Sequence, residues 1–266
     1  MKDLKVLGYT LLLIFCALVA IYLIFLKPEN FSEPDLYDEI IKRGKIKVGI
    51  YTDAKPFGFM NEKLEMCGYD VDLAHYIAQY LLKDRNALEL HPVTTSNRMI
   101  KVSTGEVDIV IATMTITSQR QEIVDFSIPY DWAGQALLVR TNSRITSIAD
   151  LAGQNVGVVY GTTAEKSMMT LAPNATIVGF KTYRAAYEAL KQGKIDAVTS
   201  DDTLLSRFAF EDGSVKLLPK RYTKEPYGIA FKKGNSTKQL KAQIDFAIKD
   251  LSRKNVIIRL RKKWNL

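Results

Sequence analysis

The sequence has few cysteine and histidine residues, two of each among its 266 residues. Cys16 lies in an apolar run and Cys67 in a distant polar stretch, which excludes a disulfide framework. His75 and His91 have no neighbours at the spacing of metal ligands. Zinc and haem chemistry are therefore not expected, and no cofactor is predicted.

The sequence also lacks the dense basic clusters of a nucleic-acid-binding protein. Lysine and arginine number 37 against 29 acidic residues, a formal charge of +8, but they are scattered except in residues 259–263. We interpret that run as the solvated side of a C-terminal helix, with attraction to an anionic membrane surface as the alternative. No nucleic-acid partner is predicted.

Charge is absent from Val6 to Leu26, a run of 21 residues. This length spans a hydrocarbon core of about 30 Å as a helix. No convincing small-x-small cleavage site follows the run, so residues 1–27 are predicted to be an uncleaved signal anchor, with a cleaved signal peptide as the alternative. Lys2 and Lys5 would stay in the cytoplasm. The expected location is the cell membrane with the rest of the chain extracytoplasmic, or periplasmic or secreted after cleavage.

A tether and a short helix are predicted next, over residues 28–44. Residues 28–35 are polar and bracketed by prolines, which favours an extended conformation. A helix over 36–42 should end at Gly44, because glycine readily adopts the left-handed conformation at a helix end.

The rest of the chain alternates apolar strand patterns with helical patterns, which indicates βαβ units and parallel sheets. Asp70 is available as the N-cap of the first long helix. Two strand-like segments, 135–140 and 227–231, are predicted to cross between two such runs, which makes the first lobe discontinuous. The predicted strands cover 46–50, 88–93, 107–112, 155–159, 176–180 and 197–200. The other predicted helices cover 97–104, 164–171, 183–191, 203–210 and 237–251.

Six motifs occur in an order that resembles the extracellular solute-binding proteins for polar amino acids, family 3. The resemblance extends from about Ile46 to Trp264. The motifs are Gly68-Tyr69-Asp70-Val71-Asp72-Leu73, then 108–117 followed by Arg120, Asp125-Phe126-Ser127-Ile128-Pro129-Tyr130, Gly161-Thr162-Thr163-Ala164, Ser200-Asp201-Asp202-Thr203 and Glu225-Pro226-Tyr227-Gly228.

The resemblance implies an α/β, two-lobe periplasmic-binding-protein-like fold of type II. Each lobe would be a mainly parallel sheet flanked by helices, and two hinge strands would join the lobes. Residues 45–134 and 229–266 would form lobe 1, and residues 135–228 would form lobe 2. The expected function is capture of an amino acid in the cleft and delivery to the permease subunits of an ABC transporter, without catalysis.

An amino acid needs an anion site, a cation site and a side-chain site. Arg120 suits the α-carboxylate because its guanidinium offers two parallel donors, and Thr163 begins a helix whose free N–H groups add to that site. Asp201 follows a strand at the sheet edge where ligands gather and suits the α-ammonium; a plain N-cap role is its alternative. Thr115 and the carbonyl region of Ala112 and Thr113 would share the ammonium.

The pair Asn97-Arg98 resembles members that bind glutamate or aspartate, where the arginine neutralises a second carboxylate. Tyr51 stands where glutamine-binding relatives tend to carry an acidic residue, and Tyr69 could line the aliphatic part of the ligand. Arg120, Arg98 and Asp201 sum to +1, which an acidic amino acid would neutralise. The expected order of affinity is glutamate, aspartate, glutamine.

Two other functions stay open. Some cyclohexadienyl dehydratases resemble this scaffold, but dehydration needs a positioned general acid, and none is identified beside the amino-acid site. The second is a membrane-tethered sensor whose closure is read by a separate membrane partner.

Overall fold

The computed structural model describes residues 14–19, 22 and 35–266. Residues 35–266 form a compact unit distinct from residues 1–34. Most of the predicted anchor and tether lies outside the described residues. Among those that are described, no helix combines the length and apolar content needed to cross a membrane.

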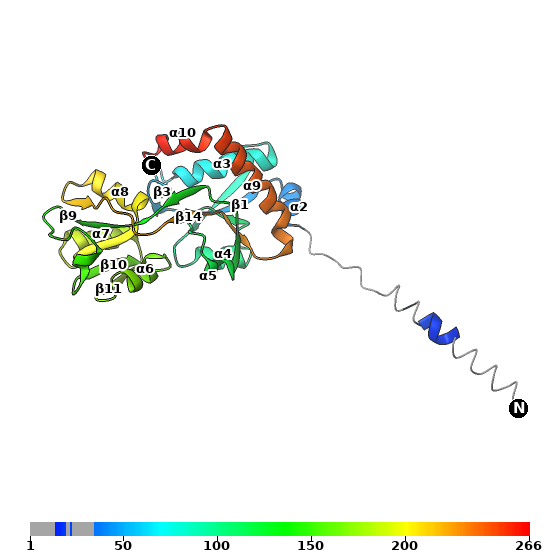
Figure 1. Ribbon diagram of the computed structural model, residues 1–266. Helices are drawn as coiled ribbons and strands as arrows, with labels where there is room; N and C mark the ends of the chain where they lie inside the picture. Colours follow the sequence, from blue (N-terminus) through cyan, green and yellow to red (C-terminus); the bar gives the residue numbers. More distant parts are fainter. Residues whose placement is uncertain (1–13, 20–21, 23–34) are drawn as a thin grey trace, which may run out of the picture. The chain divides into compact units, whose positions relative to one another are not determined.

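Two five-stranded sheets organise residues 35–266, and we call the elements around them lobe 1 and lobe 2 (Figure 1). The lobe 1 sheet has the strand order β5-β1-β6-β15-β7 and the lobe 2 sheet β11-β10-β12-β9-β13. In each sheet one strand, β15 or β9, pairs antiparallel with both neighbours. The other four strands of each sheet therefore run in one direction, as expected for a mainly parallel sheet.

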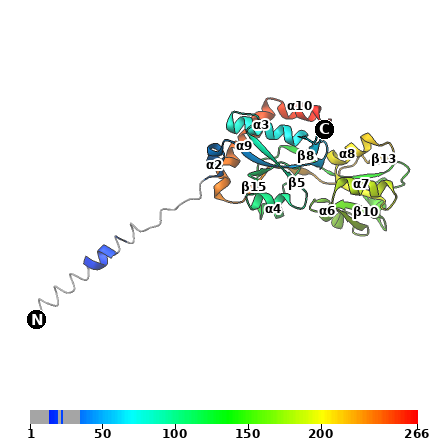
Figure 2. The same ribbon diagram turned by 180° about the vertical axis from the view of Figure 1, so that it is seen from behind.

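The helices of lobe 1 come from both ends of the chain. Leu240, Ile244 and Ile248 of α9 belong to the same core as strand β1 near the start of the unit, and α3 packs between α9 and α10 (Figure 2). The elements of lobe 1 are α2 (Leu36–Arg43), β1 (Ile46–Tyr51), β2 (Asp53–Ala54), β3 (Gly58–Met60), β4 (Met66–Cys67), α3 (Tyr69–Leu82), β5 (Leu88–Val93), α4 (Arg98–Ser103), β6 (Ile109–Val110), α5 (Ser118–Gln121), β7 (Val124–Phe126), β15 (Ala230–Lys232), η2 (Asn235–Thr237), α9 (Lys238–Arg253) and α10 (Val256–Lys263).

Lobe 2 is built from one continuous segment. The centre of its sheet is buried because helices cover apolar strands such as β12, all five of whose residues are buried. Its elements are β9 (Gln135–Arg140), η1 (Ile148–Leu151), β10 (Asn155–Val159), α6 (Ala164–Leu171), β11 (Thr176–Phe180), α7 (Tyr183–Lys191), β12 (Ala197–Asp201), α8 (Asp202–Glu211) and β13 (Val215–Leu217).

The chain crosses between the lobes through a two-stranded sheet. β8 (Asp131–Ala133) pairs antiparallel with β14 (Glu225–Tyr227). The crossing predicted over residues 135–140 is instead strand β9 inside the lobe 2 sheet. Its apolar sequence suits a crossing strand and a buried strand equally, so the pattern did not separate the two. The division into lobes at residues 134 and 228 stays a prediction.

One helix start also differs from expectation. Gly68, with a φ of 134°, is the N-cap of α3, and Asp70 lies in the first turn. A Cβ on Gly68 would lie 2.0 Å from the carbonyl oxygen of Phe57, so only glycine fits this close approach. The Asp70 carboxylate is buried and accepts from Thr113 N at 3.3 Å and from Tyr130 Oη at 3.1 Å. It therefore fixes lobe 1 segments to one another rather than capping the helix.

Candidate functional site

Two buried arginines of lobe 1 share one acceptor in lobe 2. Arg98 begins α4 and Arg120 lies in α5, and the two residues are 3% and 9% exposed. Their Nη2 atoms lie 3.4 Å and 3.0 Å from the carbonyl oxygen of Gly161. In both ribbon views α4 and α6, the helix that follows Gly161, lie on the same side of the unit (Figures 1 and 2). The arginines thus mark where the lobes meet.

Neither guanidinium forms an ion pair with any described residue. Their remaining bonds go to lobe 1 carbonyls, from Arg98 to Ala112 at 2.5 Å and from Arg120 to Thr115 at 2.8 Å. Burial, and secondly the charge of Arg98, lowers the pKa of Arg120 to about 10. Two buried cations held only by neutral carbonyls are suited to an anionic ligand group.

A second polar network centres on Asp201. Its carboxylate accepts from Tyr227 Oη at 2.6 Å and from Gln135 Nε2 at 2.8 Å. Gln135 Nε2 also lies 3.3 Å from Thr163 Oγ1, which donates to Glu225 Oε2 at 3.2 Å. The network connects strands β9, β12 and β14 with the start of α6, so it lies where lobe 2 joins the crossing strands.

Asp201 and Thr163 occupy N-cap positions, of α8 and α6, but neither side chain bonds the helix that it precedes. An N-cap side chain usually accepts from the N2 or N3 amide. Here both side chains are turned into the polar network. The alternative considered from the sequence, in which Asp201 only caps α8, is therefore wrong. Asp201 does occupy the N-cap position, but its side chain does not bond the α8 amides.

Tyr51 lies against the arginine pair. Arg98 lies over its ring with 5.3 Å from the guanidinium carbon to the ring centroid. Burial raises the pKa of Tyr51 to about 12, while the charges of Arg98 and Arg120 act against the rise. The Tyr51 hydroxyl and the Gln135 Oε1 atom have no hydrogen-bond partner among the described residues. Buried polar atoms normally find partners, so these two are candidates to contact a ligand.

Three of the expected site residues have other surroundings. Asn97 accepts from Thr94 N at 2.8 Å and orders the turn before α4. Tyr69 packs edge-on against Phe57, with 5.7 Å between ring centroids, inside lobe 1. Thr113 has a φ of 41° and contacts Asp70 through its backbone. The carbonyls of Ala112 and Thr115, expected beside the ammonium, accept hydrogen bonds from Arg98 and Arg120 instead.

Sequence reasoning did not select Gln135, Glu225 or Tyr227 for the site. Glu225 and Tyr227 stand in a motif that was read only as part of the family pattern, and both are at most 5% exposed. The sequence signal that could have identified Glu225 is its place beside Pro226 in a strand-like run. An acidic residue in a buried strand is rare and usually has a role. Gln135 lay in the segment interpreted as a crossing.

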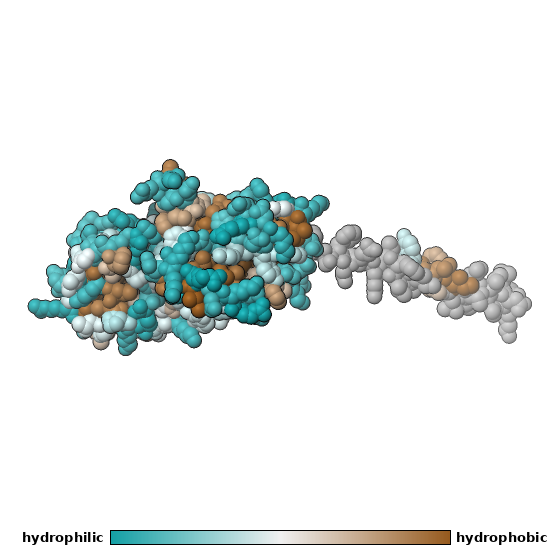
Figure 3. Space-filling view, turned by 90° about the horizontal axis from the view of Figure 1, so that it is seen from above, coloured by the Kyte–Doolittle hydropathy of each residue, from teal (hydrophilic) through white to brown (hydrophobic). Residues whose placement is uncertain are grey.

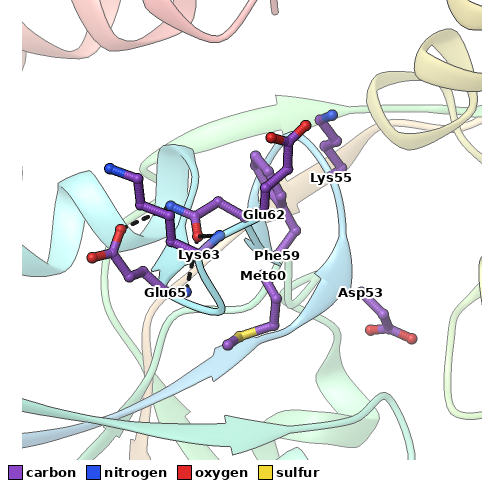
Figure 4. Close-up of a pocket in the computed structure, with 8 residues that line it drawn as sticks. Asp53, Lys55, Phe59, Met60, Glu62, Lys63 and Glu65 are labelled. Atoms are coloured by element: carbon purple, nitrogen blue, oxygen red, sulfur yellow. Dashed lines mark hydrogen bonds between the residues drawn. The ribbon is translucent and has the colours of Figure 1, made fainter.

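Two hollows that border residues 53–65 lie outside this site. One, of about 580 Å³, is lined by the loop and hairpin at residues 53–65 and bounded mainly by exposed side chains, including Lys55, Glu62 and Glu65 (Figure 4). The other, of about 130 Å³, lies between that loop and helices α7 and α8. Lys55 and Glu211 form an ion pair of 3.8 Å beside it. Arg98, Arg120 and Asp201 do not line either of these hollows.

The buried carboxyls of Asp70 and Asp201 should make the stability of the protein depend on pH. Burial raises the pKa of Asp70 and of Asp201 to about 7, against about 3.9 in an unfolded chain. The folded state therefore binds protons that the unfolded state has lost, and the free energy of unfolding should fall as the pH rises from about 4 to about 7. Each carboxyl contributes up to about 1.4 kcal/mol per pH unit.

Thermal melts of residues 35–266 between pH 5 and pH 8 measure this effect. Asp201→Asn should flatten the slope. Asp150→Asn is the matched control, because hydrogen bonds with Thr146 and Ser147 hold the pKa of this exposed carboxyl below its usual range. A stability that rises over the window, or an unchanged slope in Asp201→Asn, would contradict the prediction.

Comparison with known proteins gives the site a family context. A sequence model of bacterial extracellular solute-binding proteins, family 3, matches residues 46–266. The ABC transporter glutamine-binding protein GlnH of Bacillus subtilis (strain 168) is 37% identical over 235 residues, 88% of this chain and 85% of GlnH. A glutamine-binding protein of Geobacillus stearothermophilus is 40% identical over 203 residues, 76% of this chain and 78% of the relative.

A solved structure agrees in fold. The crystal structure of the cysteine-binding protein of Campylobacter jejuni superimposes with a TM-score of 0.81 at 31% identity, over 86% of this chain and 92% of that protein. These relatives are solute-binding proteins rather than enzymes, which supports a binding role over a dehydratase. The chain belongs to the bacterial extracellular solute-binding proteins, family 3.

Proposed function

We propose that this protein captures a polar L-amino acid between its lobes and delivers it to the permease of an ABC transporter. The observation that carries the proposal is a pair of buried arginines that form no ion pair within the described part of the chain and that share the Gly161 carbonyl across the lobes. Arg120 would bind the α-carboxylate together with the N–H groups that begin α6. Asp201 would bind the α-ammonium.

The charge of the complete site favours a ligand without net charge. The charge sum of +1 that predicts glutamate counts only Arg98, Arg120 and Asp201. Glu225 is buried in the same network as Asp201 and adds a negative charge to that sum. With Asp201 kept ionised by the ammonium of the bound ligand, two cations and two anions leave the site neutral. A ligand with a further charge would then lack a counter-ion. We therefore place glutamine before glutamate and aspartate. Arg98 and the Tyr51 hydroxyl would contact the side-chain amide.

Residues 1–27 would anchor the protein as an uncleaved segment, with the binding unit extracytoplasmic. This part of the proposal rests on the long uncharged run of the sequence alone. Membrane fractionation with intact-mass analysis tests it. A soluble mature form that begins near residue 28 would show that the segment is cleaved.

Calorimetric titration of residues 35–266 with the twenty amino acids tests the ligand. We expect glutamine to bind more tightly than glutamate. Glu225→Gln leaves the site with an excess positive charge and should shift the ratio of the two affinities towards glutamate by at least about tenfold, or 1.4 kcal/mol. Arg98→Ala should shift the ratio in the opposite direction, because it leaves a second carboxylate unpaired.

Asp196→Asn is the control for Glu225→Gln. Asp196 is a lobe 2 carboxylate that pairs with Arg140 at 3.6 Å and does not contact the site network. It should leave the ratio unchanged. An unchanged affinity ratio in Glu225→Gln would mean that Glu225 does not affect which ligand charge the site prefers. If the unmodified protein bound glutamate more tightly than glutamine, the ligand would be an acidic amino acid, as the sequence predicts.

A further inference from the structure

The positive charge of the protein is concentrated at the C-terminal end of the chain. Residues 232–263 contain eleven lysines and arginines and two aspartates, a formal charge of +9, whereas the whole chain carries +8. The rest of the chain is therefore close to neutral. The segment comprises the end of β15 and helices α9 and α10.

Ion pairs neutralise only part of this charge. Both aspartates are already paired within α9, Asp245 with Lys241 at 2.7 Å and Asp250 with Arg253 and Lys254 at 2.6 Å each. Arg261 pairs with Asp131 of the crossing strand β8, and Lys263 pairs with Asp72 of α3. Four cations within helices α9 and α10 form no ion pair with any residue that the structure describes: Lys238, Lys249, Arg259 and Lys262.

Helical spacing turns these four cations to the outer sides of α9 and α10. Leu240, Ile244 and Leu251 define the buried side of α9, and Val256 and Leu260 that of α10. Phe246 and Ile258 are 57% and 53% exposed on the same two helices. We call Lys238, Lys249, Arg259, Lys262, Phe246 and Ile258 the basic face. Cations interspersed with exposed apolar side chains are typical of helices that lie on a membrane surface.

The point where the described unit begins lies beside this face. Asp35 Oδ2 accepts from the backbone N of Gln239, near the start of α9, at 3.0 Å. The chain therefore enters the unit next to α9. The side on which α10 lies in Figure 1 is largely hydrophilic, with scattered apolar patches (Figure 3).

We propose that the basic face binds the anionic headgroups of the membrane and holds lobe 1 against the bilayer. Each lysine or arginine near an anionic surface strengthens binding roughly fivefold. The attraction should weaken with salt, since the charges are exposed and screened. This proposal is independent of which amino acid the protein binds.

Vesicle flotation tests the proposal with residues 35–266, a compact unit with its own hydrophobic cores. We expect binding to phosphatidylcholine vesicles that contain phosphatidylglycerol at low salt, and none to pure phosphatidylcholine. The variant Lys249→Glu/Arg259→Glu/Lys262→Glu should bind at least about 100-fold more weakly. The matched control Lys181→Glu/Lys194→Glu/Lys220→Glu has the same net charge but changes exposed lysines of lobe 2, and it should lose less than about fivefold.

Three results would overturn the proposal. Absence of binding to the anionic vesicles at low salt is the first. The second is an equal loss of vesicle affinity in the two triple variants, which would show that net charge rather than the basic face causes binding. Binding of duplex DNA that the first triple variant abolishes, with vesicle binding unaffected, would make a polyanion other than the membrane the partner.

Discussion

Arg120→Ala is expected to remove measurable binding of every amino acid. The variant loses the guanidinium that we assign to the α-carboxylate, the group common to all amino acids, and it also leaves the carbonyls of Thr115 and Gly161 without this donor. Truncating one partner of a buried charge pair costs about 2–5 kcal/mol, or roughly 30-fold to several thousand-fold in Kd. Calorimetric titration with the amino acid that binds the unmodified protein most tightly measures the loss.

Arg140→Ala separates this effect from a general loss of stability. Arg140 is also a partly buried arginine that donates to two carbonyls, those of Leu190 and Ile195, but it does so within lobe 2. We expect Arg140→Ala to lower the melting temperature and to leave ligand affinity within a few-fold. Similar losses of affinity in both variants would show that Arg120 acts through the fold rather than on the ligand.

Gly161→Ala is expected to prevent the lobes from meeting and to weaken binding of all ligands by at least about 100-fold. Gly161 has a φ of 76°, and a Cβ there would lie 2.5 Å from the carbonyl oxygen of Thr95 in lobe 1. Alanine at positive φ costs about 1–2 kcal/mol, and the contact with Thr95 adds a backbone clash that no side-chain movement relieves. Small-angle scattering with saturating ligand should show compaction for the unmodified protein and none for this variant.

Gly153→Ala is the matched control for backbone strain. Gly153 lies in the same lobe with a φ of 72°, but a Cβ there meets no atom within 4 Å. It should lower the melting temperature by a similar amount and leave affinity and compaction unchanged. If Gly161→Ala compacts as the unmodified protein does, the Thr95 contact does not limit closure.

The fold followed from the sequence because its signals are local. Helical spacing predicted α9 to within two residues at its C-terminal end, and the apolar run at 197–200 predicted β12. Crossing strands are less visible, since their identity depends on which sheet they join. The three-residue strands β8 and β14 carry too little pattern to be distinguished from loops.

The candidate site could be predicted only in part for the same reason. Arg98, Arg120, Thr163 and Asp201 stand beside recognisable helix and strand ends. The structure brings the two arginines to the meeting of the lobes and places Thr163 and Asp201 in the network beside the crossing strands. Glu225 reaches the site through a hydrogen bond to a residue 62 positions earlier. A contact between residues so far apart produces no repeating pattern in the sequence. The charge of the site that was summed from the sequence therefore left out Glu225.

The free N-caps of α6 and α8 have a consequence for local stability. A capping side chain contributes about 0.5–2 kcal/mol to its helix, and Thr163 and Asp201 withhold that contribution in favour of the polar network. In the proposed function, the two helix starts give up capping stability so that Thr163 and Asp201 can serve ligand binding. The first amide of α6, Ala164 N, already donates to Thr162 Oγ1 at 3.3 Å. A carboxylate that accepts from the next two amides, those of Glu165 and Lys166, would act as the missing cap. The ligand itself would then slow fraying of that turn and protect its amides from hydrogen exchange.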